Sequence, residues 1–383
     1  MLVYLLKKRE LEMKKTILVL ANNDLGLYKF RKELLELFLV DNEVFFCTPD
    51  GKYTGKMQGM GCKFIPCNML DRRSINPFKD LSLIHFYVKT IKKVHPDIVL
   101  TYTIKPNVYG GIVCACNEVP YIANITGLGT TIENGGLLAF IAKFLYRIGL
   151  KKAKCVFFQN EDNLNFFVKN KIVSGRTRLI PGSGVNLNTH CYEPYPPENQ
   201  GIKLLFVGRI MKDKGIEELL KVIRKLHRNR KNLVLDVVGF CDEDYSHLLN
   251  EAEKEGAIVN HGIQSDMHPF YTATHCTVLP SYHEGMANVM LESSSTGRPV
   301  ITTRVPGCKE TFNEGITGFG CEARSVKSLE NAILEFLGLS HEEKEEMGRQ
   351  GRKKMESEFD RNIILKAYQE EIIAASEGPP RKK

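Results

Sequence analysis

Residues 277–292, Thr-Val-Leu-Pro-Ser-Tyr-His-Glu-Gly-Met-Ala-Asn-Val-Met-Leu-Glu, join a short apolar run to a glycine-containing loop and an amphipathic stretch. The apolar run ending at Pro280 is typical of a buried strand, and the following helix is predicted to begin near Ala287. Free backbone N–H groups at such a helix N-terminus suit a ligand with negative charge or sugar hydroxyls. The stretch therefore predicts one strand–helix unit of a parallel sheet, with a candidate binding loop at its junction.

The same alternation of short apolar runs and amphipathic stretches extends outward through the whole chain, which is typical of an α/β protein with parallel sheets. It stops at residues 192–201, Tyr-Glu-Pro-Tyr-Pro-Pro-Glu-Asn-Gln-Gly, whose prolines fit neither a helix nor a central strand, so a linker is predicted there. We therefore expect two doubly wound Rossmann-like domains that face each other across a ligand-binding cleft. The predicted strands are 16–20, 43–47, 63–66, 98–101, 121–124, 155–158, 204–207, 233–238, 258–259, 277–279 and 300–302. The predicted helices are 28–39, 80–94, 137–151, 215–227, 244–255, 288–296, 326–337, 341–356 and 359–375.

The predicted domain organisation follows from this linker. It comprises an N-terminal extension (1–12), an N-terminal Rossmann-like domain (13–195), a C-terminal Rossmann-like domain (196–358), a C-terminal helix (359–376) that packs back on the first domain, and a disordered tail (377–383). The extension is either native or a consequence of start-site choice, because Met13 directly precedes the first predicted strand. Its charges follow the apolar residues, unlike those of a secretory signal peptide.

Composition and charge exclude several classes of protein. With 43% hydrophobic and 26% charged residues, the chain of 383 residues is a soluble globular protein, neither disordered nor collagen-like. No transmembrane segment is expected, because the best candidate, residues 137–150, is interrupted by Lys143 and Arg147. Residues 1–200 hold 27 Lys and Arg against 17 Asp and Glu, whereas residues 201–383 hold 26 against 28. The basic half suits a nucleic acid, a phosphorylated ligand or an anionic membrane, and a solubilising lysine-rich surface is an equal alternative.

The eleven cysteines include no Cys-x-x-Cys pair, and most lie in apolar runs. This usage favours free thiols in a reducing cytoplasm over a disulfide framework or a zinc site.

A second binding loop is predicted in Phe206-Val-Gly-Arg-Ile-Met-Lys-Asp-Lys-Gly215, where Arg209 and Lys214 follow a buried strand and precede a helix. Two fixed cations beside a helix N-terminus suit a diphosphate, although an ordinary basic turn would look alike. Glu284 and Glu292 lie eight residues apart, one on a loop and one on the helix, and can reach opposite ends of one ligand. As isolated residues they would be a first-turn acid and a surface residue.

Together these motifs resemble the retaining family 4 glycosyltransferases of GT-B fold, over residues 14–375. The first half also resembles the subgroup that builds bacterial capsule, exopolysaccharide and lipid-linked glycans. The segments that carry this second resemblance are Thr103-Ile-Lys-Pro-Asn-Val-Tyr-Gly, Asn124-Ile-Thr-Gly-Leu-Gly, Val156-Phe-Phe-Gln-Asn and Ile180-Pro-Gly-Ser-Gly-Val-Asn.

The resemblance implies a role for each matching position. Residues 13–195 would be the acceptor domain and residues 196–358 the nucleotide-sugar domain. Glu284, Arg209 and Lys214 would be catalytic, with the two cations on the donor diphosphate and Glu284 on the donor sugar. Glu292 would bind the ribose, Gly262 and Ile263 the base, and the loop of residues 22–26 would face the diphosphate. The implied donor-binding residues are Gly26, Gly208, Gly262, Ile263, Gly285, Met286, Ala287, Asn288 and Glu292, and those on the acceptor side are Lys105, Thr126 and Gly127.

Two features depart from the family pattern. The loop of residues 22–26 carries one glycine where many members have two, and residues 124–131 lack the histidine that several members place near the reacting sugar. His283 is expected to be an ordinary loop histidine. No Asp-x-Asp metal motif occurs, since Asp242-Glu-Asp244 is expected to start a helix. We therefore expect neither a metal nor another cofactor.

The resulting hypothesis is transfer of an N-acetylhexosamine or hexose from a nucleoside diphosphate sugar, UDP-linked, to a polyprenyl-diphosphate-linked saccharide. The enzyme would be cytoplasmic and peripheral on the inner face of the plasma membrane. Basic residues beside 137–150 would approach anionic headgroups, and a solvated amphipathic helix is an equal alternative. These residues are Lys143, Arg147, Lys151, Lys152 and Lys154. The competing hypotheses are a UDP-sugar epimerase of the same fold and a non-enzymatic nucleic-acid-binding module, for which no basic recognition helix is found.

Overall fold

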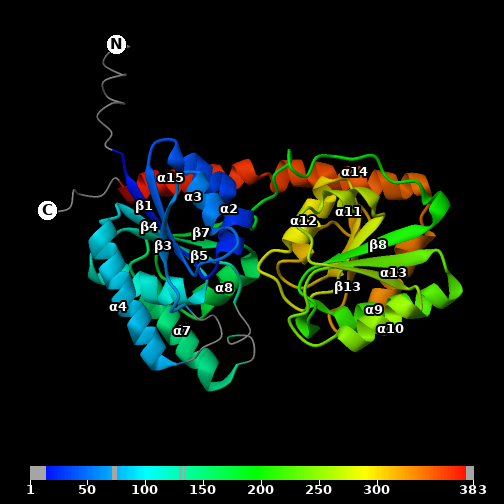
Figure 1. Ribbon diagram of the computed structural model, residues 1–383, viewed down its shortest axis with the longest axis horizontal. Helices are drawn as coiled ribbons and strands as arrows, with labels where there is room; N and C mark the ends of the chain where they lie inside the picture. Colours follow the sequence, from blue (N-terminus) through cyan, green and yellow to red (C-terminus); the bar gives the residue numbers. More distant parts are fainter. Residues whose placement is uncertain (1–13, 71–75, 129–131, 133–134, 377–383) are drawn as a thin grey trace, which may run out of the picture. The chain divides into compact units, whose positions relative to one another are not determined.

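The computed structural model describes residues 14–70, 76–128, 132 and 135–376 (Figure 1). The predicted extension of residues 1–12 and the predicted tail of residues 377–383 lie outside this range. The chain divides into two compact units, one of residues 1–180 and 365–383 and the other of residues 181–364. They are called unit 1 and unit 2 here, and each is described by itself.

Unit 1 contains a parallel sheet of seven strands in the order β3-β2-β1-β4-β5-β6-β7. The strands are β1 (Thr16–Leu20), β2 (Glu43–Thr48), β3 (Lys63–Pro66), β4 (Ile98–Tyr102), β5 (Tyr121–Ile125), β6 (Cys155–Phe158) and β7 (Thr177–Leu179). The helices are α2 (Asp24–Leu39), α3 (Thr54–Gly59), α4 (Pro77–Val94), η1 (Pro106–Gly110), α5 (Gly111–Cys116), α7 (Gly136–Leu150), α8 (Glu161–Lys169) and α15 (Arg361–Ser376). Helices α2, α3 and α15 cover one face, and α4, α5 and α7 the other (Figure 1).

Unit 2 contains a parallel sheet of six strands in the order β10-β9-β8-β11-β12-β13. The strands are β8 (Ile202–Val207), β9 (Leu233–Val238), β10 (Ile258–Gly262), β11 (Cys276–Leu279), β12 (Val300–Thr303) and β13 (Gly318–Cys321). The helices are η2 (Glu198–Gln200), η3 (Lys212–Lys214), α9 (Ile216–Asn229), α10 (Ser246–Lys254), α11 (His268–Ala273), α12 (Asn288–Ser295), η4 (Lys309–Thr311), α13 (Val326–Gly338) and α14 (His341–Glu358). Helices α9, α10 and α13 cover one face, and α11 and α12 the other (Figure 1).

Both sheets form because their central strands are apolar on both faces, which suits a parallel sheet covered by helices. All five residues of β4 and all four of β11 are buried. The helices turn one apolar side to the sheet, as α9 does with Leu219, Val222 and Ile223. This two-unit α/β architecture confirms the predicted fold class.

The predicted strands and long helices are all present, with ends shifted by a few residues, and the structure adds two strands. β7 and β13 each lie at one edge of their sheet, where they pair on one side only. β7 has three residues, none of them buried, so its sequence lacks the apolar run that marks the central strands. β13 reads Gly-Phe-Gly-Cys, and glycines weaken a strand pattern.

The boundary between the units differs from the predicted one, because unit 2 begins at Pro181 rather than after residue 195. The proline-containing segment is packed on unit 2. Val185 exchanges backbone hydrogen bonds with Phe359 and Arg361, and the Tyr195 hydroxyl donates to the carbonyl of His275. Prolines lack a backbone donor, but their carbonyls still accept hydrogen bonds, so this segment belongs to the folded unit.

At the other end of the chain, residues from Leu365 onward group with unit 1. This is six residues later than the start of the helix expected over 359–376. Within the described residues, no helix is both long and apolar enough to cross a membrane.

Candidate active site

The predicted cations and acids of unit 2 meet where the strand order reverses. The chain adds β9 and β10 on one side of β8 and then β11 and β12 on the other, so the loops after β8 and β11 leave the same edge of the sheet side by side. Such a switch point is the usual ligand site of doubly wound sheets. Here the Lys214 ammonium donates a hydrogen bond to the Glu284 carboxylate, and Arg209 Nη1 donates to Asp242 Oδ2 at 2.9 Å.

Backbone contacts fix the position of Lys214 against Glu284. Gly215 has φ +69°, and a side chain there would place its Cβ 2.2 Å from the carbonyl oxygen of Pro280. The Tyr282 N–H donates to the carbonyl of Asp213 at 2.9 Å. The loop after β8 is therefore joined to the loop after β11, and Gly215 permits their close approach.

A second pair of loops positions Arg209. Gly239 has φ +154°, and a Cβ on Gly239 would lie 1.7 Å from the carbonyl oxygen of Gly208. Ile210 then donates to the Phe240 carbonyl at 2.8 Å and accepts from the Asp242 N–H at 3.1 Å. This pairing sets the Asp242 carboxylate beside the Arg209 guanidinium.

Asp242 and Asp244 therefore have separate roles in the structure. Asp242 pairs with Arg209, whereas Asp244 accepts from the backbone N–H of Ser246 at 3.2 Å, near the start of α10. Helix α10 begins at Ser246, two residues later than the expected start at Asp244, and the pairing of Asp242 with Arg209 was not predicted.

The four charged side chains are partly accessible. Lys214 and Glu284 are 16% and 15% exposed, and Arg209 and Asp242 are 31% and 17% exposed. Each cation is balanced by one carboxylate, so the pairs are held without an unpaired buried charge. An anionic ligand that reaches this edge can take the place of either carboxylate as partner to the cations.

The loop after β12 supports Glu284 from a third side. Gly307 has φ +81°, and a Cβ there would lie 2.4 Å from the carbonyl oxygen of Glu284. Cys308 is buried beside it, and burial, followed by the Glu284 carboxylate, raises the pKa of Cys308 to about 12. Cys308 is thus a neutral packing residue of the site and no candidate nucleophile.

The amides predicted to bind the donor are partly engaged within the loop itself. The Ala287 N–H donates to the Gly307 carbonyl at 2.7 Å and the Asn288 N–H to the Met286 carbonyl at 3.0 Å. The Asn288 side chain accepts from the Ser183 hydroxyl at 2.7 Å. Met286 is buried in an apolar cluster with Val185, Leu291, Met355 and Phe359. The prediction that all the amides of residues 285–288 face the ligand is therefore wrong for Ala287 and Asn288, whose N–H groups close the loop.

Glu292 has a partner that the sequence did not indicate. The hydroxyl of Tyr271, on α11, donates to Glu292 Oε2 at 2.7 Å. Burial, followed by the negative charge of Glu292, raises the pKa of Tyr271 well above its ordinary value. The phenol therefore stays protonated and holds one carboxylate oxygen of Glu292. Tyr271 lies in a short helix of mixed pattern, so only its fold position identifies it.

The predicted base-contacting residues lie at the end of β10, the edge strand of the same sheet. Gly262 has φ +61°, and its carbonyl accepts from the Gly239 N–H at 2.8 Å. Ile263 follows with 73% of its surface exposed. An exposed apolar side chain at this edge can pack against a flat ring.

The candidate residues of unit 1 also lie at the carboxyl ends of strands. Lys105 follows β4 and donates to Asp80 Oδ1 at 2.8 Å, and the Tyr109 hydroxyl donates to the other oxygen of Asp80. Thr126 and Gly127 follow β5, in a segment whose continuation over 129–131 lies outside the described residues.

The glycine loop predicted over residues 22–26 is shorter in the structure. Helix α2 begins at Asp24, so Gly26 lies in its first turn, and its N–H donates to Asn23 Oδ1 at 2.6 Å. Asn23 is the N-cap residue of the helix, and its side chain accepts a hydrogen bond from the Gly26 N–H. His283 Nε2 lies 3.9 Å from Asp213 Oδ2, so this loop histidine faces η3.

Comparison with known families identifies the class of protein. The profile of the family described as glycosyl transferases group 1 matches residues 193–354, and that of glycosyl transferase 4-like matches residues 17–160. Together these two matches cover most of both units. The chain is therefore a glycosyltransferase that carries a domain of each of these two families.

Two curated relatives match almost the whole chain. An N,N'-diacetylbacillosaminyl-diphospho-undecaprenol alpha-1,3-N-acetylgalactosaminyltransferase from Campylobacter jejuni is 26% identical over 370 residues, covering 91% of this chain and 96% of its own. The capsular polysaccharide biosynthesis glycosyltransferase CapM from Staphylococcus aureus is 26% identical, covering 88% of this chain and 92% of its own.

Solved structures confirm the GT-B fold. A glycosyltransferase from Rickettsia africae has a TM-score of 0.76 at 18% identity, covering 96% of this chain and 100% of its own. Anabaena HepE, solved with UDP and glucose, has a TM-score of 0.77 at 16% identity, covering 94% of this chain and 100% of its own.

Proposed function

We propose that this glycosyltransferase moves an N-acetylhexosamine or hexose from a UDP-linked donor to a polyprenyl-diphosphate-linked saccharide, with retention of anomeric configuration. The observation that carries this proposal is the pair of cations Arg209 and Lys214, each held by one carboxylate at the switch point of unit 2. A diphosphate entering this edge exchanges those carboxylates for its own oxygens.

In the proposed reaction the bond between the sugar C1 and the donor phosphate oxygen breaks, and a bond from C1 to the acceptor hydroxyl oxygen forms. The acceptor proton passes to the departing phosphate, on the same face of the sugar. Arg209 and Lys214 stabilise the negative charge that develops on the diphosphate. Glu284, released from Lys214, accepts hydrogen bonds from the donor sugar. Because the cations supply the positive charge, we propose that the reaction needs no metal.

The nucleoside end of the donor is proposed to lie along α12 and β10. One oxygen of Glu292 is held by Tyr271, and the other is then oriented to accept hydrogen bonds from the ribose. Ile263 provides an exposed apolar contact for the base. UDP as the nucleotide is supported by the resemblance of the motifs and by the fold shared with HepE, which was solved with UDP.

The acceptor class is proposed from the relatives that match the whole chain. The Campylobacter protein is named for a diphospho-undecaprenol-linked acceptor, and CapM for capsular polysaccharide biosynthesis. In unit 1, Lys105 with its partner Asp80 at the end of β4 offers a cation to the acceptor, and Thr126 and Gly127 lie after the neighbouring strand β5.

An acceptor in the membrane requires a membrane-facing surface, and α7 of unit 1 offers one. This helix leaves six apolar side chains exposed, namely Leu137, Leu138, Phe140, Ile141, Phe144 and Ile148. Helix α4 adds Phe78 and Leu81 near its own N-terminus, and both helices pack against η1. Each helix follows a strand of one parallel sheet, so both N-termini lie at the carboxyl edge that carries Lys105. We propose that this apolar surface inserts into an anionic bilayer on the cytoplasmic side, in keeping with the basic first half of the chain.

The cations expected to touch headgroups are not equivalent. Lys143 donates to Asn170 Oδ1 at 3.3 Å, and Arg147 donates to the carbonyls of Asn170 and Lys171. These two side chains hold the end of α8, so the expectation that they face lipid is replaced by a structural role. Lys152 Nζ donates to the carbonyl of Ala115 at 3.4 Å. Lys151, which also follows α7, is exposed and keeps the proposed headgroup role.

The donor proposal is tested by thermal stabilisation of the full chain with UDP- and GDP-sugars in EDTA, followed by a turnover assay. A ligand at 100 times its dissociation constant stabilises a protein by about 2.7 kcal/mol. We expect stabilisation by UDP-sugars and turnover onto a polyprenyl-diphosphate saccharide in EDTA. Turnover that appears only when a divalent cation is added would refute the metal-free mechanism.

The membrane proposal is tested by sedimentation with vesicles of phosphatidylcholine alone or mixed with phosphatidylglycerol. Binding should require the anionic lipid and should fall strongly in the double variant Phe140→Glu, Phe144→Glu. Ile316→Glu, which changes an exposed apolar residue of unit 2, is the matched control and should bind like the wild type. Equal binding by the double variant and the control would show that α7 is not the membrane contact.

A further inference from the structure

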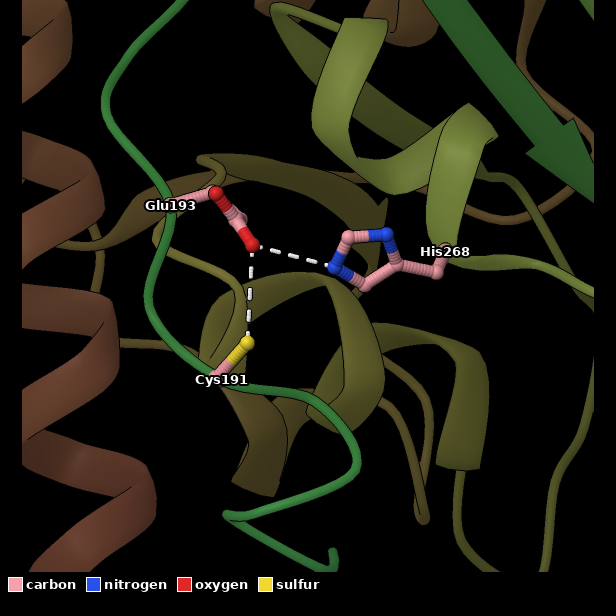
Figure 2. A group of neighbouring side chains, drawn as sticks. All are labelled: Cys191, Glu193 and His268. Carbon is pink, nitrogen blue, oxygen red and sulfur yellow. Dashed lines mark hydrogen bonds and ion pairs between the residues drawn. The ribbon is translucent and has the colours of Figure 1, made fainter.

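A group of three metal-ligating side chains lies in unit 2, formed by none of the residues proposed for catalysis (Figure 2). Cys191 and Glu193 come from the segment that precedes β8, and His268 is the first residue of α11. Glu193 Oε1 lies 3.5 Å from Cys191 Sγ and 3.0 Å from His268 Nε2. All three potential ligand atoms lie within 4.8 Å of one another. Figure 2 shows the three side chains pointing toward a common centre.

A buried framework holds the two segments that carry these side chains. The fully buried Arg298 donates to the carbonyls of Glu193 at 3.0 Å and Pro194 at 2.8 Å. The same guanidinium donates to the carbonyls of Tyr271 at 2.9 Å and Thr272 at 3.0 Å, on α11. One side chain thus fixes the segment with Cys191 and Glu193 against the helix with His268.

The segment is also held at the residue between its two ligands. Tyr192 packs so closely on Gly297 that a Cβ there would lie 2.6 Å from its ring, and the φ of Gly297 is +83°. The Glu193 N–H donates to the Thr296 carbonyl at 3.1 Å. The positions of the three ligands are therefore set before any ion arrives.

The donor set of one thiolate, one imidazole and one carboxylate is that of a zinc site. With bonds of roughly 2.0–2.3 Å, neighbouring ligand atoms of a tetrahedral Zn²⁺ lie about 3–4 Å apart. The measured separations of 3.0 and 3.5 Å fall in this range. His268 Nδ1 lies 3.5 Å from the Thr272 hydroxyl, which leaves Nε2 as the ligand atom.

We propose that Cys191, Glu193 and His268 bind one Zn²⁺, with water in the fourth position. The ion binds the thiolate form of Cys191, as metal–cysteine bonds require. It joins the segment before β8 to α11, the helix whose Tyr271 holds Glu292. The expected consequence is stabilisation of unit 2, with no chemical step assigned to the metal.

The test is titration of the full chain, freed of metal and without a histidine tag, with Co²⁺ as a spectroscopic substitute for Zn²⁺. We expect one equivalent to give a thiolate charge-transfer band in the near ultraviolet and to be displaced by Zn²⁺. The band should be absent in Cys191→Ser and in His268→Ala. Cys241→Ser removes another exposed cysteine of unit 2 and should keep the band.

Melting curves with and without Zn²⁺ complete the test. Zn²⁺ should raise the melting temperature of the wild type and of Cys241→Ser, but not of Cys191→Ser or Glu193→Gln. Melting in EDTA reports whether each variant is folded. A charge-transfer band that persists in Cys191→Ser, or the lack of any band in the wild type, would overturn the proposal. Neither result depends on the donor or acceptor of the transferase.

Discussion

The two units have the same strand order around their switch points, but the side chains at the two switch points differ in kind. In unit 2 the edge between β8 and β11 presents Arg209 and Lys214 with acidic partners, all partly exposed. In unit 1 the cation on α2, Arg31, is buried, and its guanidinium lies 5.2 Å from the centre of the Tyr102 ring. The same topology thus supports an exposed ionic site in one unit, and in the other a closed polar network beside the partly exposed pair of Lys105 and Asp80. The fold supplies the place for a site, and the side chains decide whether it can bind.

The network in unit 1 is closed by α15, which returns to this unit from the far end of the chain. The hydroxyl of Tyr102 donates to that of Tyr368 at 3.1 Å, and the Tyr368 hydroxyl donates to the side chain of Asn124. Glu371, one turn further, forms ion pairs with Arg176 and Arg178 at 2.8 and 3.1 Å. Because Tyr102, Tyr368, Asn124 and Glu371 find partners within the unit, we expect their contacts to contribute to stability rather than to ligand binding.

The largest effect is expected from substitutions that remove a charge from the ionic site of unit 2. Glu284→Ala and Lys214→Ala should each lower turnover about 100-fold or more, which is the usual effect of removing a group that stabilises developing charge. Lys214→Ala should also weaken donor binding. Lys225→Ala removes an ion pair between α9 and α13, in which an exposed lysine lies 2.7 Å from the buried Glu330, and should leave turnover close to that of the wild type. Near-wild-type turnover in Glu284→Ala would show that Glu284 has no role in the reaction.

A smaller effect is expected at the partly buried ion pair of unit 1. Lys105→Ala should raise the acceptor KM about tenfold, the equivalent of one hydrogen bond to a charged group, and leave the donor Kd unchanged. Lys89→Ala, an exposed lysine on α4, is the control. The comparison is made with steady-state kinetics in acceptor and donor separately. A rise in the donor Kd would contradict an acceptor-side role for Lys105.

One buried tyrosine in each unit allows the polar network of unit 1 to be compared with the ionic site of unit 2. Tyr368→Phe should lower the free energy of unfolding by about 1–2 kcal/mol, because Asn124 loses its hydrogen-bond donor, and should leave nucleotide binding unchanged. Tyr271→Phe removes the donor to Glu292 and should weaken UDP binding severalfold. Urea unfolding and calorimetric titration with UDP measure both quantities. Equal changes in stability and in UDP binding in both variants would show that the two networks do not differ in kind.

The smallest expected effect is the pH dependence of unit 2. Burial lowers the pKa of His275, and its Nδ1 accepts from the Lys203 N–H at 3.0 Å, which requires the neutral ring. Because the pKa of His275 is lower in the folded than in the unfolded state, the neutral ring contributes to the stability of the fold. This contribution is fully present above the unfolded pKa, about 6.5, and is lost as the pH falls below it. The slope for one proton is at most about 1.4 kcal/mol per pH unit. His275→Asn, melted between pH 7.5 and 5, should show a shallower loss than the wild type. An equal slope in both proteins would show that His275 is not the source of the pH dependence.

The sequence by itself determined the α/β class, the central strands of both sheets and the loops that hold Arg209, Lys214 and Glu284. These features are local: an apolar run marks a buried strand, and a glycine with charged neighbours marks the loop at its end. It also indicated Glu292, because a fixed spacing along one loop and helix is visible without the fold. Its prediction of free donor-binding amides does not hold for Ala287 and Asn288, whose N–H groups donate to carbonyls within the fold.

Only the tertiary structure decided the partners. Asp242 beside Arg209, Tyr271 beside Glu292, and His268 beside Cys191 are each separated by more than twenty residues, a distance at which sequence periodicity carries no information. The unit boundary at Pro181 was hidden for a related reason, because the carbonyls of Glu193 and Pro194 are held by Arg298, a hundred residues further on. A local pattern predicts which elements form, whereas the pairing of charges and hydrogen bonds depends on which elements the sheet topology brings together.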